Sequence, residues 1–218
     1  MMTWLNAIDS YVFRITHRKN LRWILDHGLH CQNSEIRDSE FVAIGSGEII
    51  ERRNNRYVPI GPGGELADYV PFYFTPCSPM LYNIVTGYNV KRVDRTDIVI
   101  LVSTVNRLRD RVIPFVFTDR HALVVYAGFY SSEDDLSVID WGLLQQRDFS
   151  RDPEDPDKLE RYQAELLVHR HVPIDAITGI ACYNDEVVSK ISEMVGISYG
   201  ALYNREHSRW GVLKRKLL

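Results

Sequence analysis

The sequence predicts a single α+β domain. Short runs of aromatic and β-branched residues, typical of strands, are interleaved along the chain with short segments that carry helix start and stop residues. A length of 218 residues suits one domain that buries most of the surface its unfolded chain exposes. No internal repeat, low-complexity tract or linker interrupts the pattern, so we expect residues 1–218 to form one domain.

The first predicted unit is a strand over residues 11–16 followed by a short helix. Asn20 is a typical N-cap residue, and Gly28 is a typical residue for the C-terminal end of a helix. A strand that leads into a capped helix leaves free backbone N–H groups that favour an anion. Residues 31–68 are then expected to be irregular, and their glycines do not form a dinucleotide-binding or Walker motif.

The middle and the end of the chain continue the alternation of strands and helices. The helix over residues 78–87 has the clearest start, with Ser78 as the N-cap and Pro79 at its first position. Residues 133–157 are acidic and broken by prolines, which predicts an excursion on the surface. The further predicted elements are strands over residues 68–76, 97–104, 113–119 and 177–184, a helix over residues 185–195 and a last edge strand over residues 209–213.

One predicted strand carries a carboxylate in an unexpected place. Residues 164–172 are too apolar for a surface loop and end before Pro173, which cannot donate to a central ladder. Glu165 lies directly before the most apolar part of this run. A buried carboxylate is costly unless it is paired, so Glu165 is either held in an ion pair or takes part in chemistry.

The composition excludes several classes of protein. The three cysteines are odd in number, far apart and not arranged as C-x-x-C, which argues against a disulfide framework or a zinc ribbon and favours a reduced, cytoplasmic setting. No apolar run approaches the roughly 18 to 20 residues that a membrane span needs, so we expect a soluble protein without a membrane partner. The net charge of -3 does not by itself favour nucleic acid, but arginine dominates the 26 basic residues and forms clusters.

The common catalytic and metal-binding motifs are weak or absent in the sequence. His169 and His171 have a spacing that zinc sites use, but no further ligands accompany them, so we expect two ordinary strand histidines and no metal. No G-x-S-x-G motif occurs, and Cys77 has little support as a nucleophile.

A group of charged and imidazole side chains remains. Taken singly, each has a structural explanation, such as a salt bridge or a hydrogen-bonded histidine. Taken together, at strand ends and in loops, they predict a site for a substrate that carries phosphate. The group consists of Arg14, His17, Arg53, His121 and Glu165.

A series of motifs in one order resembles the DarT family, bacterial toxins that ADP-ribosylate DNA with NAD. The motifs are RITHRKN with ILDHGL, then ERR, then DYVPFYFTP followed by SPML, then PFVFTDRHA, and then RYQAELLV. The match extends over nearly the whole chain, to about Tyr183, and the pair of DYVPFYF and SPML is its most specific part.

The resemblance implies an ADP-ribosyltransferase fold, in which a split, mixed β-sheet with flanking helices grips NAD in a V-shaped cleft. Glu165 matches the family's catalytic glutamate, Arg53 matches a catalytic arginine of the NAD-binding loop, and His121 matches an active-site histidine. Cys77 departs from the arginine or phenylalanine often found there, which affects one contact of the cleft wall. The residues that the resemblance assigns to NAD binding are Arg14, Ile15, Thr16, His17, Trp23, His30 and Arg53.

The resemblance also implies substrates and partners. NAD is expected as a co-substrate without a metal, and a base of single-stranded DNA is expected as the acceptor, with thymine favoured over guanine. A DarG-like macrodomain antitoxin is expected to remove the mark that a monomeric toxin adds. Arg53 is expected to stabilise the anion of the base, and His121 to orient the base or relay its proton. Aromatic residues near the strand ends are expected to include some that stack on bases, among Tyr69, Phe72, Tyr126, Phe129 and Tyr130.

Two rival functions stay open from the sequence. The same fold could transfer ADP-ribose to protein or RNA, in which case DNA oligonucleotides stay unmodified. The chain could instead be a nucleic-acid-binding module without catalysis, in which case it would bind DNA in a salt-dependent way and consume no NAD.

Overall fold

The computed structural model of the protein describes residues 3–195, and its centre is an antiparallel sheet. The 7-stranded sheet has the order β6-β5-β7-β3-β1-β4-β9, and a 2-stranded sheet joins β2 to β8. All strand pairs of the described residues are antiparallel, so the α+β class is confirmed while the expected mixture of strand directions is wrong. The strands are β1 (Tyr11–His17), β2 (Leu29–His30), β3 (Tyr69–Tyr73), β4 (Ile98–Thr104), β5 (Phe115–Thr118), β6 (Phe129–Tyr130), β7 (Glu165–His169), β8 (His171–Val172) and β9 (Gly179–Cys182).

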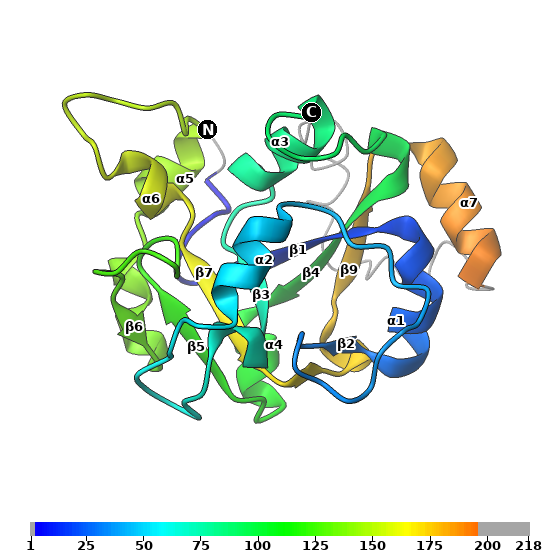
Figure 1. Ribbon diagram of the computed structural model, residues 1–218, viewed down its shortest axis with the longest axis horizontal. Helices are drawn as coiled ribbons and strands as arrows, with labels where there is room; N and C mark the ends of the chain where they lie inside the picture. Colours follow the sequence, from blue (N-terminus) through cyan, green and yellow to red (C-terminus); the bar gives the residue numbers. More distant parts are fainter. Residues whose placement is uncertain (1–2, 196–218) are drawn as a thin grey trace.

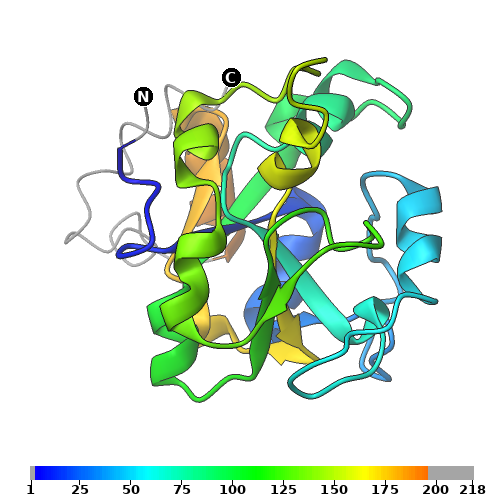
Figure 2. The same cartoon turned by 90° about the vertical axis from the view of Figure 1, so that its left-hand side faces the viewer.

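Helices lie around the sheet (Figure 1 and Figure 2). Figure 1 shows α2 in front of the sheet, with α5 and α6 at the upper left and α7 at the right-hand edge. In the turned view α2 lies at the right-hand edge, apart from the strands in the middle (Figure 2). No helix among the described residues combines the length and the apolar character that crossing a membrane requires. The helices are α1 (Leu21–His27), α2 (Gly47–Arg53), α3 (Pro79–Thr86), α4 (Val105–Asp110), α5 (Trp141–Gln146), α6 (Lys158–Tyr162) and α7 (Asp185–Val195).

The large sheet is split between β1 and β3. Strand β1 pairs with β4 from Tyr11 to His17, but its pairing with β3 is limited to Phe13 and Tyr73. Beyond this contact the two strands diverge and leave a gap. Pro71 lies on the gap, so its missing N–H leaves no ladder bond unmade, which explains a proline in a strand that is central in the sheet order.

The helix boundaries follow the predicted signals, with one exception. Ser78 caps α3 by accepting a backbone N–H of the first turn, and Gly28 ends α1 with a φ of 80°. Asn20 precedes α1 but makes no side-chain cap bond. Its side chain instead binds Thr16 and the backbone of Val42, which ties the segment after β2 to the end of β1.

Two segments expected to lack structure contain helices. Residues 31–68 hold α2 and end in the short 3-10 turn η2 (Leu66–Asp68). Residues 133–157 hold α5, whose Leu143 and Leu144 are buried in the core, so this segment is not wholly a surface excursion. The sequence did not predict α2 and α5, because helices of so few turns show little hydrophobic periodicity.

The predicted strand over residues 164–172 is two strands. Arg170, with a φ of 61°, turns the chain after β7, so that β8 leaves the large sheet and pairs with β2. His169 and His171 therefore lie on different strands, where their rings pack against those of Tyr69 and His30. The edge strand expected over residues 209–213 lies outside the described residues.

The core consists of two apolar clusters. The larger one surrounds the middle strands and includes the fully buried Leu101 and Leu166. The smaller one lies under the segment after α2 and joins it to β5 and to the loop that follows β5. Its buried members are Val58, Leu66, Tyr69, Val116, Ala122 and Leu167.

Candidate active site

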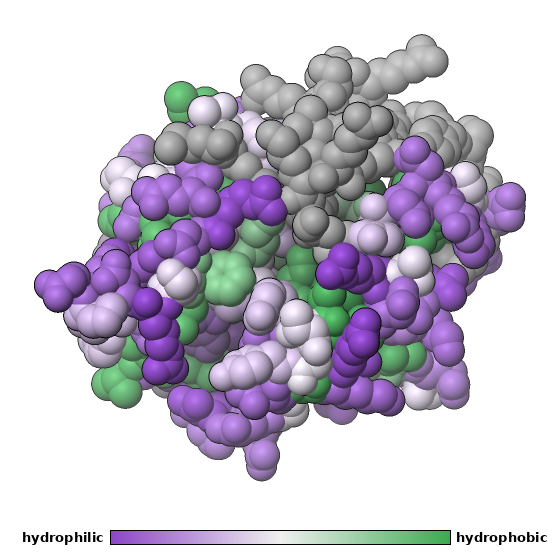
Figure 3. Space-filling view, turned by 90° about the horizontal axis from the view of Figure 1, so that it is seen from above, coloured by the Kyte–Doolittle hydropathy of each residue, from purple (hydrophilic) through white to green (hydrophobic). Residues whose placement is uncertain are grey.

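A cavity of about 340 Å³ lies where the sheet is split. Strands β1, β2 and β3 and helices α1 and α2 contribute to its wall. Figure 3 shows the molecule from above, where apolar side chains lie in a hollow that polar side chains surround. The polar and aromatic lining of the cavity includes Arg14, Thr16, Trp23, His30, Arg37 and Arg53.

Glu165 is the first residue of β7 and is 2% exposed. Its Oε2 accepts a hydrogen bond of 2.8 Å from Nη1 of Arg53, and its Oε1 accepts one of 3.2 Å from the backbone N–H of Ala122. Burial by itself raises the pKa of the Glu165 carboxyl, but Arg53, His121 and the two hydrogen bonds outweigh burial, and the pKa lies below its usual value. Glu165 is therefore an anion at neutral pH, fixed from two sides.

Two guanidinium groups face the gap between β1 and β3. Arg14 donates from Nη1 to the carbonyl oxygen of Pro71 at 3.2 Å, across the split. Burial, followed by the charge of Arg53, lowers the pKa of Arg14 to about 10, so Arg14 is still charged at neutral pH. The guanidinium of an arginine such as Arg53 is not deprotonated in proteins. With Glu165 the group has a net positive charge, which favours an anionic ligand.

Both arginines also carry buried donors without a partner. Nε of Arg14 and Nη2 of Arg53 are buried and make no hydrogen bond within the described residues. A buried donor left unsatisfied costs about 1–3 kcal/mol, and more when it is charged. These two N–H groups thus fit a ligand that presents oxygen acceptors to the cavity.

His121 follows β5 and lies beside Glu165. Its Nε2 lies 4.0 Å from Oε1 of Glu165, which is too long for a hydrogen bond. Its Nδ1 accepts the backbone N–H of Leu123 at 3.2 Å, so a neutral ring carries its proton on Nε2. Burial lowers the pKa of His121, against the opposing effect of Glu165, and the ring is neutral at pH 7.

Tyr73 belongs to the site although the sequence did not single it out. It is the residue of β3 that pairs with Glu165. Burial, and then the negative charge of Glu165, raise the pKa of Tyr73, so its phenol stays protonated. The alternation of side chains along β3 could have identified Tyr73. Phe72 and Phe74 are both fully buried in the core, so the residue between them must face the other side of the sheet.

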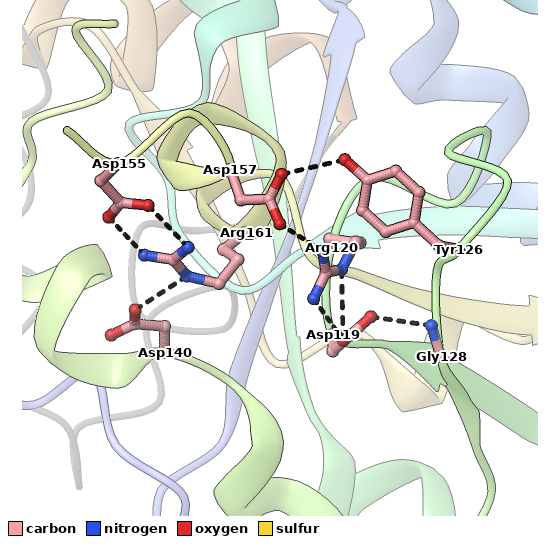
Figure 4. A network of polar contacts seen from close by, with 8 residues as sticks. All are labelled: Asp119, Arg120, Tyr126, Gly128, Asp140, Asp155, Asp157 and Arg161. Carbon is pink, nitrogen blue, oxygen red and sulfur yellow. Dashed lines mark hydrogen bonds and ion pairs between the residues drawn. The ribbon is translucent and has the colours of Figure 1, made fainter. Parts of the chain in front are cut away.

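An ion-pair network anchors the loop that carries His121 and Ala122 (residues 119–128). Arg120 binds the carboxylates of Asp119 and Asp157, and Asp157 also accepts the hydroxyl of Tyr126 at 2.9 Å. A neighbouring arginine on α6 pairs with two further aspartates (Figure 4). The side chains and the backbone group in this network belong to Asp119, Arg120, Tyr126, Gly128, Asp140, Asp155, Asp157 and Arg161.

The structure brings most of the predicted site residues together. The side chains of Ile15 and His17 are not part of the cavity wall, because they alternate along β1 with those that are. The main chain of Ile15 faces the gap, since Phe13, two residues earlier, pairs with β3. Arg53 links the cavity to Glu165, and His121 lies beside that carboxylate. The predicted residues that line the cavity are Arg14, Thr16, Trp23, His30 and Arg53.

The part of the chain that the structure describes holds no cluster of metal-ligating side chains. No group of three or more histidine, cysteine, aspartate or glutamate side chains there could hold a metal ion. Cys77, which departs from the resembled pattern, is half-buried after β3, and burial raises the pKa of its thiol.

Comparison with known proteins identifies the family. The family described as "DarT: ssDNA thymidine ADP-ribosyltransferase, DarT" matches residues 13–209. The chain belongs to the DarT family. The resemblance found in the motifs is therefore confirmed, and with it the class of enzyme, an NAD-dependent DNA ADP-ribosyltransferase.

Relatives and solved structures are similar over most of their length. The DNA ADP-ribosyl transferase of Escherichia coli O127:H6 is 50% identical over 184 residues, which are 84% of this chain and 84% of that protein. The structure of Thermus sp. 2.9 DarT in complex with ADP-ribosylated ssDNA has a TM-score of 0.77 and 37% identity, and covers 87% of this chain and 90% of that chain. The structure of the same Thermus protein with NAD+ has a TM-score of 0.73 and 35% identity, with 86% and 90% covered. The expected ADP-ribosyltransferase fold is confirmed.

Proposed function

We propose that this chain transfers ADP-ribose from NAD to a thymine of single-stranded DNA, with Glu165 and Arg53 as its catalytic pair. The observation that carries the proposal is the contact of Arg53 with Glu165. One arginine both lines the cavity at the split of the sheet and holds the buried carboxylate. The family's activity and the Thermus relative's complexes with NAD+ and ADP-ribosylated ssDNA support the choice of substrates.

NAD fits the cavity as the co-substrate. The unpaired donors on Arg14 and Arg53 suit phosphate or carboxamide oxygens, and Trp23 offers an aromatic wall. The open edge of β1 adds main-chain groups, because the backbone of Ile15 and His17 faces the gap where β3 is absent. The residues proposed to hold NAD are Arg14, Ile15, Thr16, His17, Trp23, His30 and Arg53.

Glu165 assists the departure of nicotinamide. As the bond from ribose C1′ to the nicotinamide nitrogen breaks, its electron pair leaves with nicotinamide and positive charge develops on the ribose. Opposite charges about 4 Å apart attract by roughly 4 kcal/mol at an effective dielectric constant near 20, which corresponds to a rate effect of several hundredfold or more. Because Arg53 and Ala122 already fix the carboxylate, little reorganisation is needed during the reaction.

Arg53 also serves the acceptor base. Attack by thymine N3 forms the bond from N3 to C1′ while the N3 proton is lost to water. The guanidinium of Arg53 stays protonated, so it stabilises the anionic base and does not take the proton. Neutral His121 donates from Nε2, because its Nδ1 is already an acceptor, so its role is to orient Glu165 or the base. A proton relay through His121 would require the other tautomer.

Fewer residues are available to contact DNA than the sequence indicated. Of the expected stacking residues, Tyr69 and Phe72 are buried in the core, whereas Tyr126, in the same loop as His121, is 60% exposed. Arg109 on α4 pairs with Glu133, and Arg111, directly after α4, pairs with Asp175, which leaves these arginines less available to phosphates. We therefore assign base stacking to Tyr126 first.

The partners follow from the family resemblance. We propose that the enzyme is a toxin that acts as a single-domain monomer in the cytoplasm and that a DarG-like macrodomain antitoxin reverses its product. In support of a monomer, one chain supplies both arginines, the carboxylate and the histidine of the site. Gel filtration with light scattering, alone and with a macrodomain protein, tests the monomer and the partner separately.

The test of the function is mass spectrometry of single-stranded oligonucleotides incubated with NAD. Thymine-only, guanine-only and mixed sequences are each treated with the parent chain, Glu165→Ala and, as a control, Glu133→Ala, which removes an ion pair far from the cavity. One ADP-ribose on thymine, made by the parent and by the control but not by Glu165→Ala, supports the proposal.

The rival acceptors make different predictions in the same experiment. NAD that is consumed while all DNA stays unmodified would favour a protein or RNA acceptor. Intact NAD together with unmodified DNA would favour a binding module without catalysis. An adduct on guanine alone would keep the reaction and change the base.

A further inference from the structure

Arg56 lies three residues after Arg53, past the end of α2, and its side chain reaches the loop of residues 119–128. Its Nε donates to the carbonyl oxygen of Ala122 at 3.2 Å, and its Nη2 donates to the carbonyl oxygens of Val124 and Val125 at 3.0 and 3.2 Å. Its own carbonyl oxygen accepts the backbone N–H of Leu66 at 2.9 Å. The main chain of Arg56 is thus fixed by a hydrogen bond, and its guanidinium donates hydrogen bonds to three backbone oxygens of one loop.

Ala122 is held from two sides by these contacts. Its N–H donates to Oε1 of Glu165, and its carbonyl oxygen accepts from Arg56. The other oxygen of Glu165 accepts from Arg53, which belongs to the same short segment as Arg56. The contacts therefore close a ring that runs from Glu165 through Arg53, Arg56 and Ala122 back to Glu165.

We propose that Arg56 is a positioning residue for the transfer reaction, which keeps the N–H of Ala122 and the ring of His121 aimed at Glu165. The inference rests on the proposed function, because it takes Glu165 to be the catalytic carboxylate. Arg56 acts through the loop, since it is not among the residues that line the cavity. It also links the two sides of the site, since Arg53 lines the NAD cavity while Ala122 and His121 belong to the opposite loop.

The surroundings of Ala122 favour such a role. Its side chain is fully buried in the small apolar cluster with Val58 and Leu66, so the loop is seated on the segment that follows α2. The far end of the loop is anchored separately, by Asp119 and Asp157 (Figure 4). Arg56 therefore supplies the polar link between the loop and the segment that begins with Arg53.

A planar guanidinium suits this position better than an ammonium group. It presents several N–H donors in fixed directions, whereas lysine offers a compact charge on a flexible stem. Arg56→Lys keeps the charge but cannot reproduce three directed bonds. It therefore separates the geometry of the contacts from their charge.

The first test is the kinetics of ADP-ribosylation of a thymine oligonucleotide. For Arg56→Ala we expect kcat to fall by about 10- to 100-fold while KM for NAD changes by less than about threefold, because orientation is lost and NAD contacts are kept. Arg56→Lys is expected to recover only part of kcat. The acid limb of the kcat–pH profile is expected to move to higher pH, since the N–H of Ala122 contributes to the low pKa of Glu165.

Arg107 provides a matched control. Like Arg56, it is half-buried and donates side-chain hydrogen bonds to the main chain. Its two bonds go to the carbonyl oxygen of Asp175, and it lies on α4 away from the site. Arg107→Ala is expected to leave kcat and the pH profile unchanged. A kcat of Arg56→Ala within twofold of the parent would overturn the proposal, as would equal losses of kcat in the two variants.

A second measurement does not depend on activity. Hydrogen exchange followed by mass spectrometry is expected to show faster exchange in peptides covering residues 119–128 for Arg56→Ala, and unchanged exchange there for Arg107→Ala. If the parent chain modifies no DNA, the proposed function fails while the exchange result still tests the contact. Unchanged exchange in Arg56→Ala would overturn the positioning role even in an active enzyme.

Discussion

The two sides of the active site are built differently. The NAD-side segment (residues 32–52) contains no buried residue. Apart from bonds to neighbours within four residues in sequence, the hydrogen bonds described between residues 35–52 and the rest of the chain are the two that join Asn20 and Val42. This segment approaches the sheet mainly through its end, where Arg53 binds Glu165.

The loop-side segment (residues 119–162) is held at many points. Arg120, Arg161 and Lys158 each bind one or two aspartates within it. Leu143 and Tyr162 are buried in the core beneath these ion pairs. Exposed ion pairs contribute little singly, so it is their combination with buried side chains that fixes this side.

The unequal anchoring of the two segments explains how one site can admit NAD and still keep its catalytic groups in position. The lightly anchored side has little to break when a substrate enters, because few buried contacts cross it. The firmly anchored side presents His121 and Ala122 to Glu165 without needing the substrate to arrange them. Arg53 directly follows the lightly anchored segment, and its hydrogen bond to Glu165 joins that segment to the firmly anchored side.

The largest expected effect comes from removing the residue that joins the two sides. Arg53→Gln is expected to lower kcat/KM by about 10²- to 10³-fold, because it removes a charge from the base and leaves Glu165 without its ion pair. Single-turnover transfer to a thymine oligonucleotide measures it. Arg52→Gln is the matched control, since Arg52 lies on the same helix and is exposed. Near-full activity in Arg53→Lys would show that the forked donor is unnecessary.

A smaller effect is expected from Arg14, which we propose binds NAD and does not contact the acceptor base. Arg14→Gln is expected to raise KM for NAD about tenfold with kcat changed less than about threefold, the cost of one charge-assisted hydrogen bond. Initial rates at varied NAD concentrations provide the measurement. Arg18→Gln, which removes the ion pair with Asp97 outside the cavity wall, is expected to leave both constants unchanged. A fall in kcat for Arg14→Gln with constant KM would move Arg14 from binding to catalysis.

Binding of NAD is expected to protect the lightly anchored segment from proteolysis and to leave the firmly anchored segment unchanged. Saturating NAD is expected to slow proteolytic cleavage within residues 34–47 several-fold, because binding to the folded state opposes local opening. Cleavage within residues 147–157 is expected to keep its rate. Gel electrophoresis of timed digests with and without NAD measures both. Equal protection of the two segments would contradict the difference in anchoring.

The smallest expected effect is a pH dependence of stability at His121. Burial lowers the pKa of His121 from its usual value of 6.5, so the unfolded chain binds this proton more readily than the folded one. The stability that the neutral ring contributes is present above pH 6.5 and is lost as the pH falls below it towards the folded pKa. Urea denaturation at pH values near 7.5 and 5.5 is expected to show a smaller loss of unfolding free energy for His121→Gln than for the parent. Equal losses would contradict the burial of a neutral ring.

Much of the fold followed from local patterns. The strand at Tyr11, the Ser78 cap with Pro79 and the stop at Gly28 were predicted because each depends on neighbours in sequence. Helix α2 was missed because one short turn-rich segment carries little periodic signal. The break at Arg170 was missed because a positive φ at an arginine is set by the pairing of β8 with β2, which no local pattern announces.

The candidate site divides in the same way. Glu165 was recognisable as a carboxylate at the head of an apolar run, and the motif order pointed to Arg53 and His121. Tyr73 and Arg56 were not recognised, because the first depends on its pairing with Glu165 and the second on a loop far along the chain.

Local sequence patterns predicted the central strands, the cap of α3 and the residues that carry charge, because hydrophobic periodicity and side-chain chemistry are local properties. The tertiary structure alone decided that β1 and β3 diverge after a single pair, that Arg53 meets Glu165 across 112 positions, and that a neutral His121 keeps its proton on Nε2. These outcomes depend on contacts between distant segments. Their free energy arises only when the sheet has closed around them.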